Sequence, residues 1–274
     1  MALVPFPQNR DDEQLLAKAD PAPDAEAEPA GEGRMTFLEH LDELRKRITH
    51  AVTGLLVGFI LSFVIYEQVR DFIYQKLAGQ IPGGKFIYTE PTEGFFLLMK
   101  MCALTGVLIA SPYIMLQVWL FIAPGLYAKE KKFAIPFVLS SSLLFIAGAA
   151  FTHYVVFPAA WTFFAGFSND YMEFTPRIDP VFGLYVRLVI ALGLTFQLPV
   201  LIFVLSRLGI ISPQFLIRNF KYAVLAMVVA AAIITPDGNP ITQLLVAGPM
   251  VGLYLLGIAA AWLFGKSKKS DPTD

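Results

Sequence analysis

Six long segments almost free of charged residues follow one another along this chain, and they constrain the fold more than any other feature. A helix needs about 20 apolar residues to cross the hydrocarbon core of a bilayer. The period-two alternation that is typical of membrane β-barrels is absent. We therefore predict an all-α integral membrane protein with six transmembrane helices. The predicted spans are residues 48–66, 95–122, 134–157, 182–206, 222–235 and 241–264.

The overall composition agrees with a membrane protein. Of 274 residues, 56% are hydrophobic and only 16% are charged, whereas soluble domains carry about 25% charged residues. A single cysteine, Cys102, excludes an intramolecular disulfide and a cysteine-based metal cluster. The three histidines are far apart, and no HExxH, GxSxG or glycine-rich phosphate loop occurs. The sequence therefore predicts no enzyme, no cofactor and no metal site.

The basic residues that flank the six segments predict the orientation. With the N-terminus in the cytoplasm, thirteen Lys and Arg residues lie on the inner side and four on the outer side. Short cytoplasmic loops collect positive charge. We therefore predict an N-in, C-in topology.

Both ends of the chain lie outside the membrane domain, which we place at residues 34–265. Residues 1–33 contain eight of the 22 acidic residues but only two of the 21 basic ones, and they show no apolar periodicity. This composition is typical of a disordered segment, here an acidic cytoplasmic tail rather than a signal peptide. Residues 266–274 form a short basic and polar cytoplasmic tail.

A charged run, residues 35–47 (MTFLEHLDELRKR), precedes the first span. Thr36 followed by Glu39 matches a capping box. Beneath a charged face, an apolar stripe recurs at helical spacing and consists of Phe37, Leu41, Leu44 and Ile48. We expect a separate helix lying on the cytoplasmic surface of the membrane.

The fifth segment is anomalous because its 14 residues would span only about 21 Å as a helix. The turn TPDGNP follows it. We expect short fifth and sixth helices joined by a tight outer turn, which would thin the bilayer locally. A re-entrant hairpin is the alternative. The outer connections at residues 67–94 and 158–181 are expected to be loops that cap the bundle.

Few polar side chains interrupt the spans. Lys100 and Arg187 stand near the outer ends of their segments, where they either anchor the helix at the interface or mark an ion pathway. Gln197 lies in mid-span before Pro199, and kinks are expected at Pro199 and at Pro112 of the second span. It can bond within the chain or to a partner helix. Close helix packing is expected at Gly148.

Acidic residues are scarce on the predicted cytoplasmic side. They are Glu39, Asp42 and Glu43 in the charged run, and Glu130 in the first inner loop. Carboxylates that lie among basic loops could bind the guanidinium groups of arginine residues from a partner through paired hydrogen bonds. The alternative is that Glu43 simply pairs with Arg47 one helical turn away, and that Glu130 is solvated.

Six short motifs in register with the spans are similar to those of the TatC family, the core receptor of the twin-arginine (Tat) protein translocase. The motifs are HLDELRKR from His40, PTEGFF from Pro91 with Lys100, QVWLFIAPGLYAKEKK from Gln117, FQLPV from Phe196, ITPDGNPITQ from Ile234, and the dipeptide PM at Pro249. The resemblance covers nearly the whole membrane body.

The resemblance implies a cupped six-helix bundle that binds twin-arginine signal peptides at its cytoplasmic face. It also implies the single-span partners TatA and TatB, self-association, and export of folded proteins driven by the protonmotive force, in the cytoplasmic (inner) membrane of a bacterium. Glu43 and Glu130 match the signal-binding carboxylates of the family, and Arg45 and Phe121 lie in the same region. Asp237 matches a family aspartate, for which turn capping is the simple interpretation. No nucleic-acid partner is implied.

Two positions depart from the family pattern. Gln197 and Leu255 stand where many relatives carry glutamate, which suggests that partner contact relies on a neutral hydrogen bond from Gln197. The alternative function is a polytopic secondary transporter or channel for a small solute, against which the lack of a mid-span carboxylate argues.

Overall fold

The computed structural model describes residues 37–79, 81, 85–122, 134–171, 174–235 and 240–264. The chain forms two units, Met1–His40 and Leu41–Asp274. Helix α2 begins in the first unit, and the account below concerns the second. Both predicted tails, the capping residue Thr36, and the candidate residues Glu130 and Asp237 lie outside the described residues.

Helices make up almost all of the described chain. Their order is α2 Phe37–Ser62, η1 Phe63–Ile65, α3 Tyr66–Ala78, α4 Glu93–Ile122, α5 Ala134–Phe151, η4 Thr152–Val156, α6 Phe157–Ala165, α7 Ile178–Thr195, α8 Leu198–Arg207, α9 Pro213–Arg218, α10 Phe220–Ile234 and α11 Pro240–Phe264.

The helical runs confirm the all-α membrane fold. In the described part of the chain, five runs are long and apolar enough to cross a membrane, and the shorter apolar helix α10 makes the sixth segment. The fifth helix is short as expected, with 15 residues. The expectation of a short sixth helix is wrong, because α11 has 25 residues and continues through Pro249.

The charged run is not a separate surface helix. It forms the first turns of α2, which continues without interruption from Phe37 to Ser62. No proline breaks this stretch, and the hydroxyls of Thr49 and Thr53 bond to carbonyl oxygens one turn back, which is compatible with a regular helix. We call the end of the bundle where α2 begins and α4 ends the inner end, and the opposite end the outer end.

The first outer connection also differs from the expected loop. Residues Tyr66–Ala78 form helix α3, which follows α2 after the single 3-10 turn η1. The charges of Glu67, Arg70 and Asp71 end the apolar pattern but not the helix, because charged residues with flexible side chains remain compatible with helical backbone. Only the segment after α3 is irregular.

The kink expected at Pro199 is present as a short break between two helices. Helix α7 ends at Thr195, and α8 begins at Leu198 with Pro199 in its first turn. Proline cannot donate a backbone hydrogen bond, so the series of backbone hydrogen bonds along the helix is interrupted just before Pro199. No such break occurs at Pro112, the other proline at which a kink was expected, because Pro112 lies inside the continuous helix α4.

Glycine allows two close helix crossings. A Cβ built on Gly148 of α5 would lie 2.9 Å from the Gly193 Cα of α7, which confirms the close approach predicted at Gly148. A Cβ on Gly106 of α4 would lie 2.7 Å from the backbone nitrogen of Phe59 in α2. The helices therefore touch backbone to backbone at these points.

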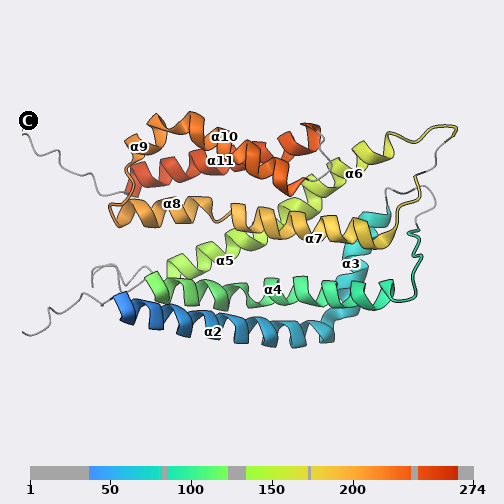
Figure 1. The fold of residues 1–274 in the computed structure, drawn as a ribbon, viewed down its shortest axis with the longest axis horizontal. Helices are drawn as coiled ribbons and strands as arrows, with labels where there is room; N and C mark the ends of the chain where they lie inside the picture. The colour runs from blue at the N-terminus through green and yellow to red at the C-terminus, as the bar shows by residue number, and fades with distance from the viewer. Residues whose placement is uncertain are drawn as a thin grey trace, which may run out of the picture. The chain divides into compact units, whose positions relative to one another are not determined.

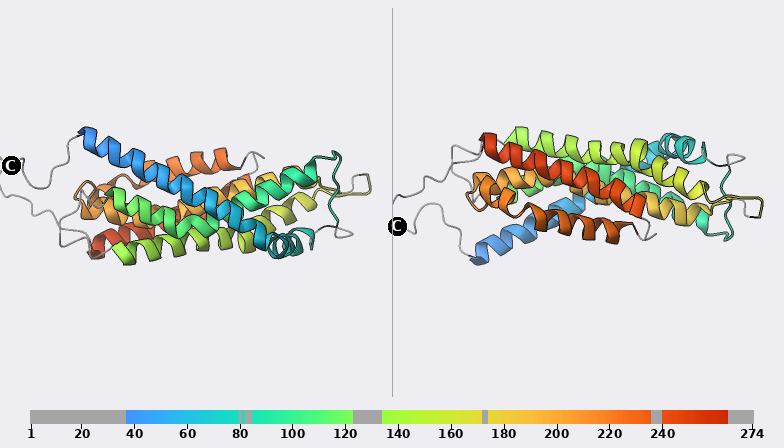
Figure 2. Two further views of the ribbon diagram at one scale, coloured as in Figure 1. Left: turned by 90° about the horizontal axis from the view of Figure 1, so that it is seen from below. Right: turned by 90° about the horizontal axis from the view of Figure 1, so that it is seen from above.

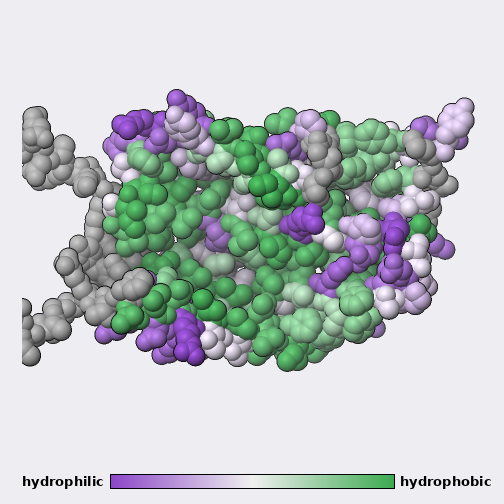
Figure 3. All heavy atoms as spheres, in the orientation of Figure 1, coloured by the Kyte–Doolittle hydropathy of each residue, from purple (hydrophilic) through white to green (hydrophobic). Residues whose placement is uncertain are grey.

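The remaining helices pack on this framework. Helix α11 lies beside both α8 and α10, and α5 contacts α4 and α7 (Figures 1 and 2). The face drawn in Figure 3 is largely hydrophobic over the middle of the long helices, and hydrophilic residues gather toward their ends. This distribution is the one expected where lipid surrounds the bundle.

Candidate functional site

The candidate site at the inner end is built on the first turns of α2 and the last turns of α4. Arg47 Nε donates to Glu43 Oε1 over 2.6 Å, and Arg47 Nη2 lies 2.5 Å from the same oxygen. The side chains of Glu43 and Arg47 are 18% and 21% exposed. The predicted pairing one helical turn apart is therefore present, and it is half-buried rather than fully solvated.

This ion pair faces α4. Arg47 Nη1 donates to Gln117 Oε1 over 3.4 Å, and the Gln117 side chain is buried. Phe121 lies one turn after Gln117 on the same face of α4 and is half-buried. Glu43 and Phe121 therefore lie at the same end of the bundle, and their role in binding a signal peptide stays a prediction from the family resemblance.

The other residues of the charged run differ in their environment. Arg45 and Asp42 are exposed, as are the apolar residues Leu41 and Ile48 of the predicted stripe. The side of α2 that turns toward the bundle is thus the one carrying Glu43, Leu44 and Arg47. Whether Glu130 completes the site stays a prediction, because it lies outside the described residues.

Gln197 is bonded within the chain. Its Nε2 donates to the carbonyl oxygen of Ser141 in α5 over 2.8 Å. This contact joins the α7–α8 break to α5. Of the two interpretations left open by the sequence, the intramolecular bond is therefore present, and contact with a partner helix stays a prediction.

At the outer end, Lys100 is part of an ion pair between two helices. Lys100 Nζ of α4 lies 2.5 Å from Asp179 Oδ1, in the first turn of α7. The interpretation of Lys100 as a simple interfacial anchor is therefore incomplete. Asp179 was not predicted, although an acid in the first turn of a helix is a signal that could have pointed to it.

A second outer ion pair joins the two outer connections. Glu93, only 5% exposed, accepts from Arg177, whose guanidinium also lies 3.9 Å from Glu90. The backbone nitrogen of Ile178 bonds to the carbonyl oxygen of Ile87 over 3.1 Å. The hydrogen bond with Glu93 raises the pKa of the Arg177 guanidinium above its ordinary value. This pair was also missed in the sequence.

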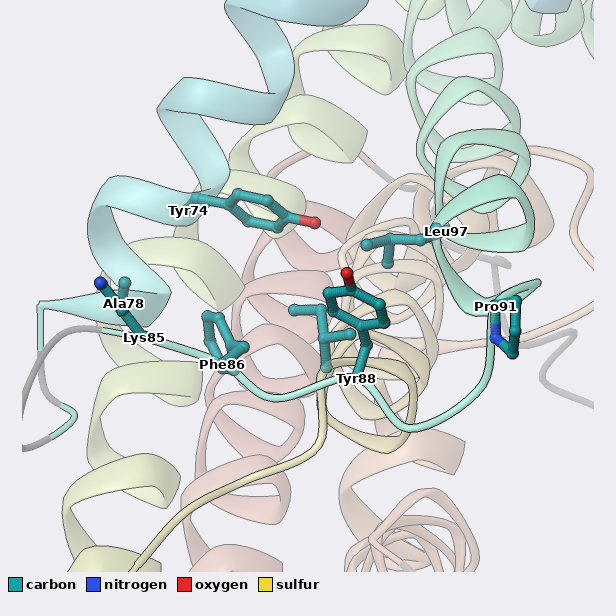
Figure 4. A pocket seen from close by; sticks show the side chains of 9 residues that line it. Tyr74, Ala78, Lys85, Phe86, Tyr88, Pro91 and Leu97 are labelled. Carbon is teal, nitrogen blue, oxygen red and sulfur yellow. The ribbon is translucent and has the colours of Figure 1, made fainter.

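Beside this pair lies an outer cavity of about 610 Å³. Tyr74 from α3 and Leu97 from α4 point toward it, and Phe86 and Tyr88 line it from the connection between these helices (Figure 4). Its lining is mixed apolar and aromatic. Among the described residues, no group of three potential metal ligands from His, Cys, Asp and Glu occurs.

The fold and these contacts define a polytopic helical membrane protein in which polar side chains of the described residues join neighbouring helices. The particular family follows from comparison with known proteins. The family model described as Sec-independent protein translocase protein (TatC) matches residues 39–249.

Curated relatives agree with this match over most of the chain. A Sec-independent protein translocase protein TatC from Koribacter versatilis is 40% identical over 84% of this chain and 86% of its own length. A TatC protein from Synechocystis is 36% identical over 92% of this chain and 97% of its own length. The chloroplastic protein of Arabidopsis thaliana is 37% identical over 84% of this chain and 66% of its own length.

The fold comparison gives the same result. A crystal structure of the twin-arginine translocase receptor TatC superposes with a TM-score of 0.73 at 35% identity, covering 82% of this chain and 98% of that one. The chain belongs to the TatC family. It is therefore a multi-pass membrane component of a protein translocase and not an enzyme.

Proposed function

We propose that this protein is the signal-peptide receptor of a twin-arginine translocase and that its inner end binds the paired arginines. The single observation that carries the proposal is the Glu43 carboxylate, which already accepts two guanidinium nitrogens in a half-buried site. A carboxylate that already accepts hydrogen bonds from one arginine guanidinium can accept them from the guanidinium of a signal-peptide arginine. The solved relative named a twin-arginine translocase receptor supports the same role.

Bidentate binding at this site requires an exchange of partners. A guanidinium that binds a carboxylate in this way contacts both of its oxygens, and Oε1 of Glu43 already accepts both contacts from Arg47, so an incoming arginine competes with Arg47 for this oxygen. Gln117 Oε1 already accepts from Arg47 and would hold the displaced guanidinium. The exchange replaces one charge-assisted contact with another, and the carboxylate never stays unpaired in the half-buried site.

The remaining residues of the proposed site have separate roles. Glu130 supplies the second carboxylate, so that each arginine of the pair meets one acid. Phe121, half-buried at the end of α4, offers an aromatic face to apolar residues that follow the arginines. Arg45, exposed on α2, binds acceptors on the signal peptide or the lipid headgroups.

The partners and energy source follow from the same proposal. TatA and TatB, as single-span proteins, associate with the bundle, copies of the chain self-associate, and the protonmotive force drives export of folded proteins across the bacterial cytoplasmic membrane. Gln197 is the proposed contact for a partner helix. It can serve this role while it holds Ser141, because the Gln197 side chain is only half-buried and retains a second N–H and its carbonyl oxygen.

Site-directed crosslinking tests the receptor proposal. A photoreactive twin-arginine signal peptide should crosslink to the wild-type protein in membranes, and Glu43→Ala or Glu130→Ala should abolish the product while the protein still inserts. Asp42→Ala, at the exposed neighbouring position, is the matched control and should crosslink normally. Normal crosslinking in both glutamate variants would contradict the assignment.

A further inference from the structure

A cavity of about 520 Å³ opens on the flank of the bundle between α3, α4, α5 and η4. We call it the flank cavity. Its walls are almost entirely apolar. Its volume lies within the roughly 300–1,000 Å³ that is usual for ligand sites. The residues that carry the argument are Phe72, Leu104, Leu108, Ile146, His153 and Tyr154.

The mouth of the flank cavity lies on the surface that faces lipid. Phe72 and Tyr154 are 50% and 53% exposed, and Ile146 is 46% exposed. All three belong to runs long and apolar enough to span the membrane. The molecules that meet this opening in a bilayer are therefore phospholipids.

The apolar surface continues from the flank cavity toward the inner end. A groove of about 470 Å³ between α4 and α5 shares Ile146 with the cavity and extends past Leu143 to Leu116. Ile146 lies seven residues before His153, which is about 10 Å along a helix. An acyl chain that enters at His153 can therefore lie along α5 for the depth of one half of the hydrocarbon core, about 15 Å.

One buried polar atom in the wall has no hydrogen-bond partner among the described residues. His153 is only 3% exposed, and its Nδ1 lies 3.0 Å from the hydroxyl of Tyr185. Among the described residues, nothing bonds to its Nε2. We assign the ring proton to Nε2, because the buried Tyr185 hydroxyl then donates to Nδ1. Buried polar atoms are nearly always paired, so this N–H points to an acceptor on an occupant.

The ring of His153 is held firmly in place. It stacks on Phe72 with ring centroids 4.5 Å apart and an interplanar angle of 19°. His153 also belongs to the π-helical segment η4, a rare conformation that is frequent at functional sites. The donor is therefore fixed in position rather than free to turn toward another residue.

The outer rim of the flank cavity carries a cation. Lys76 lies one turn after Phe72 on α3 and is exposed, with its Nζ 5.6 Å from the ring centroid of Tyr154. Lys76 lies in the last turn of α3, two residues before the end of the apolar run Leu38–Ala78. A basic residue at the end of a membrane-spanning run lies at the depth of the headgroups.

We propose that the flank cavity binds one anionic phospholipid of the outer leaflet. An acyl chain lies against Leu108 and Ile146, an ester carbonyl oxygen accepts from His153 Nε2, and the headgroup phosphate lies beside Lys76. This site is separate from the inner end, where the signal peptide is proposed to bind. The lipid occupies the seam between α3, α4 and α5.

Native mass spectrometry of the full chain in a neutral detergent tests this site. The probes are phosphatidylglycerol and phosphatidylethanolamine with identical acyl chains. The wild-type protein should bind the first phosphatidylglycerol about fivefold more tightly than phosphatidylethanolamine, since one basic residue at an anionic lipid surface contributes on that order. Lys76→Gln should remove this preference, and Arg70→Gln, a cation of the same helix paired with Asp71, should retain it.

Two variants in the wall of the flank cavity distinguish the contacts of the lipid headgroup from those of the acyl chains. His153→Phe should weaken the binding of both lipids by a similar factor and leave their ratio unchanged. Ile146→Trp should fill the mouth of the flank cavity and abolish binding of the first molecule of either phosphatidylglycerol or phosphatidylethanolamine. Both variants keep apolar bulk in the wall, and a thermal unfolding midpoint near that of the wild type would verify their folding.

Three outcomes would overturn the proposal. The first is equal affinity of the wild type for the two lipids. The second is an unchanged preference in Lys76→Gln. The third is Ile146→Trp binding lipid normally while failing to co-purify with a single-span partner, which would make the flank cavity a protein-docking site instead.

Discussion

Arg47 lies one helical turn after Glu43 and directs both Nε and Nη2 to the same carboxylate oxygen. The pair is common on helices, but here it is half-buried and also reaches Gln117 of α4. An arginine of the chain itself therefore occupies the position proposed for an arginine of the signal peptide. This relationship makes the affinity of the site depend on Arg47.

Replacing Arg47 with Gln should increase the affinity for a twin-arginine signal peptide. The variant removes the internal competitor for Glu43 Oε1, and a charge-assisted hydrogen bond contributes about 1.5–3 kcal/mol. Because the competitor is attached to the same helix and only partly buried, we expect a gain of about three- to tenfold. The measurement is a binding titration with a fluorescent peptide in detergent.

The control for this change is Lys46→Gln, which removes an equal charge from the exposed neighbouring position. Its affinity should stay equal to, or rise only slightly above, that of the wild type, because one exposed like charge is removed. A Kd for Arg47→Gln equal to that of Lys46→Gln would show that Arg47 does not compete with the peptide.

Gly148→Ala should destabilise the bundle at the crossing of α5 and α7. The new Cβ would lie 2.9 Å from both the Gly193 Cα and the carbonyl oxygen of Leu192, and both are backbone atoms that cannot turn away. Overpacking of this kind costs about 1–3 kcal/mol. Gly183→Ala, at a position of α7 with open space around the added Cβ, is the control. Thermal unfolding in detergent should show a lower midpoint only for Gly148→Ala.

Much of the fold could be predicted because it depends on local properties of the chain. The length of the apolar runs predicted the spans, Pro199 predicted a kink at the place where α7 ends, and the spacing of Glu43 and Arg47 predicted their pairing. Helix α3 was missed because its charged residues end the apolar pattern that marks a span. Charge alone does not distinguish a loop from a polar helix at the membrane interface.

The contacts between distant segments could not be predicted in the same way. Lys100 and Asp179 are 79 residues apart, and Arg47 and Gln117 are 70 residues apart. Each contact depends on which helices are neighbours and on their rotation, and neither property is encoded in a local pattern. Relative exposure is also a product of packing, so the half-buried state of Glu43 became evident only in the structure.

Removing either Glu93 or Arg177 should loosen the outer connections. Glu93 is buried and also accepts from the backbone nitrogen of Thr89 over 3.2 Å. Glu93→Gln and Arg177→Gln should each lower the thermal unfolding midpoint. The double variant should lower it by less than the sum, because both changes remove the same interaction. Fully additive shifts would show that the two side chains act independently.

Gln197→Leu should separate the internal role of this side chain from its proposed role toward a partner. The variant loses the hydrogen bond to the Ser141 carbonyl, and such bonds between membrane helices contribute about 0.6–2 kcal/mol. We expect a lower unfolding midpoint for the isolated protein and weaker co-purification with TatB.

Thr195→Val provides the comparison, because it removes a side-chain bond to Ala191 within the same helix rather than one between helices. Weaker co-purification in Gln197→Leu but not in Thr195→Val, at a matched loss of stability, would assign the partner contact to Gln197. Equal co-purification in both would restrict Gln197 to its bond with Ser141.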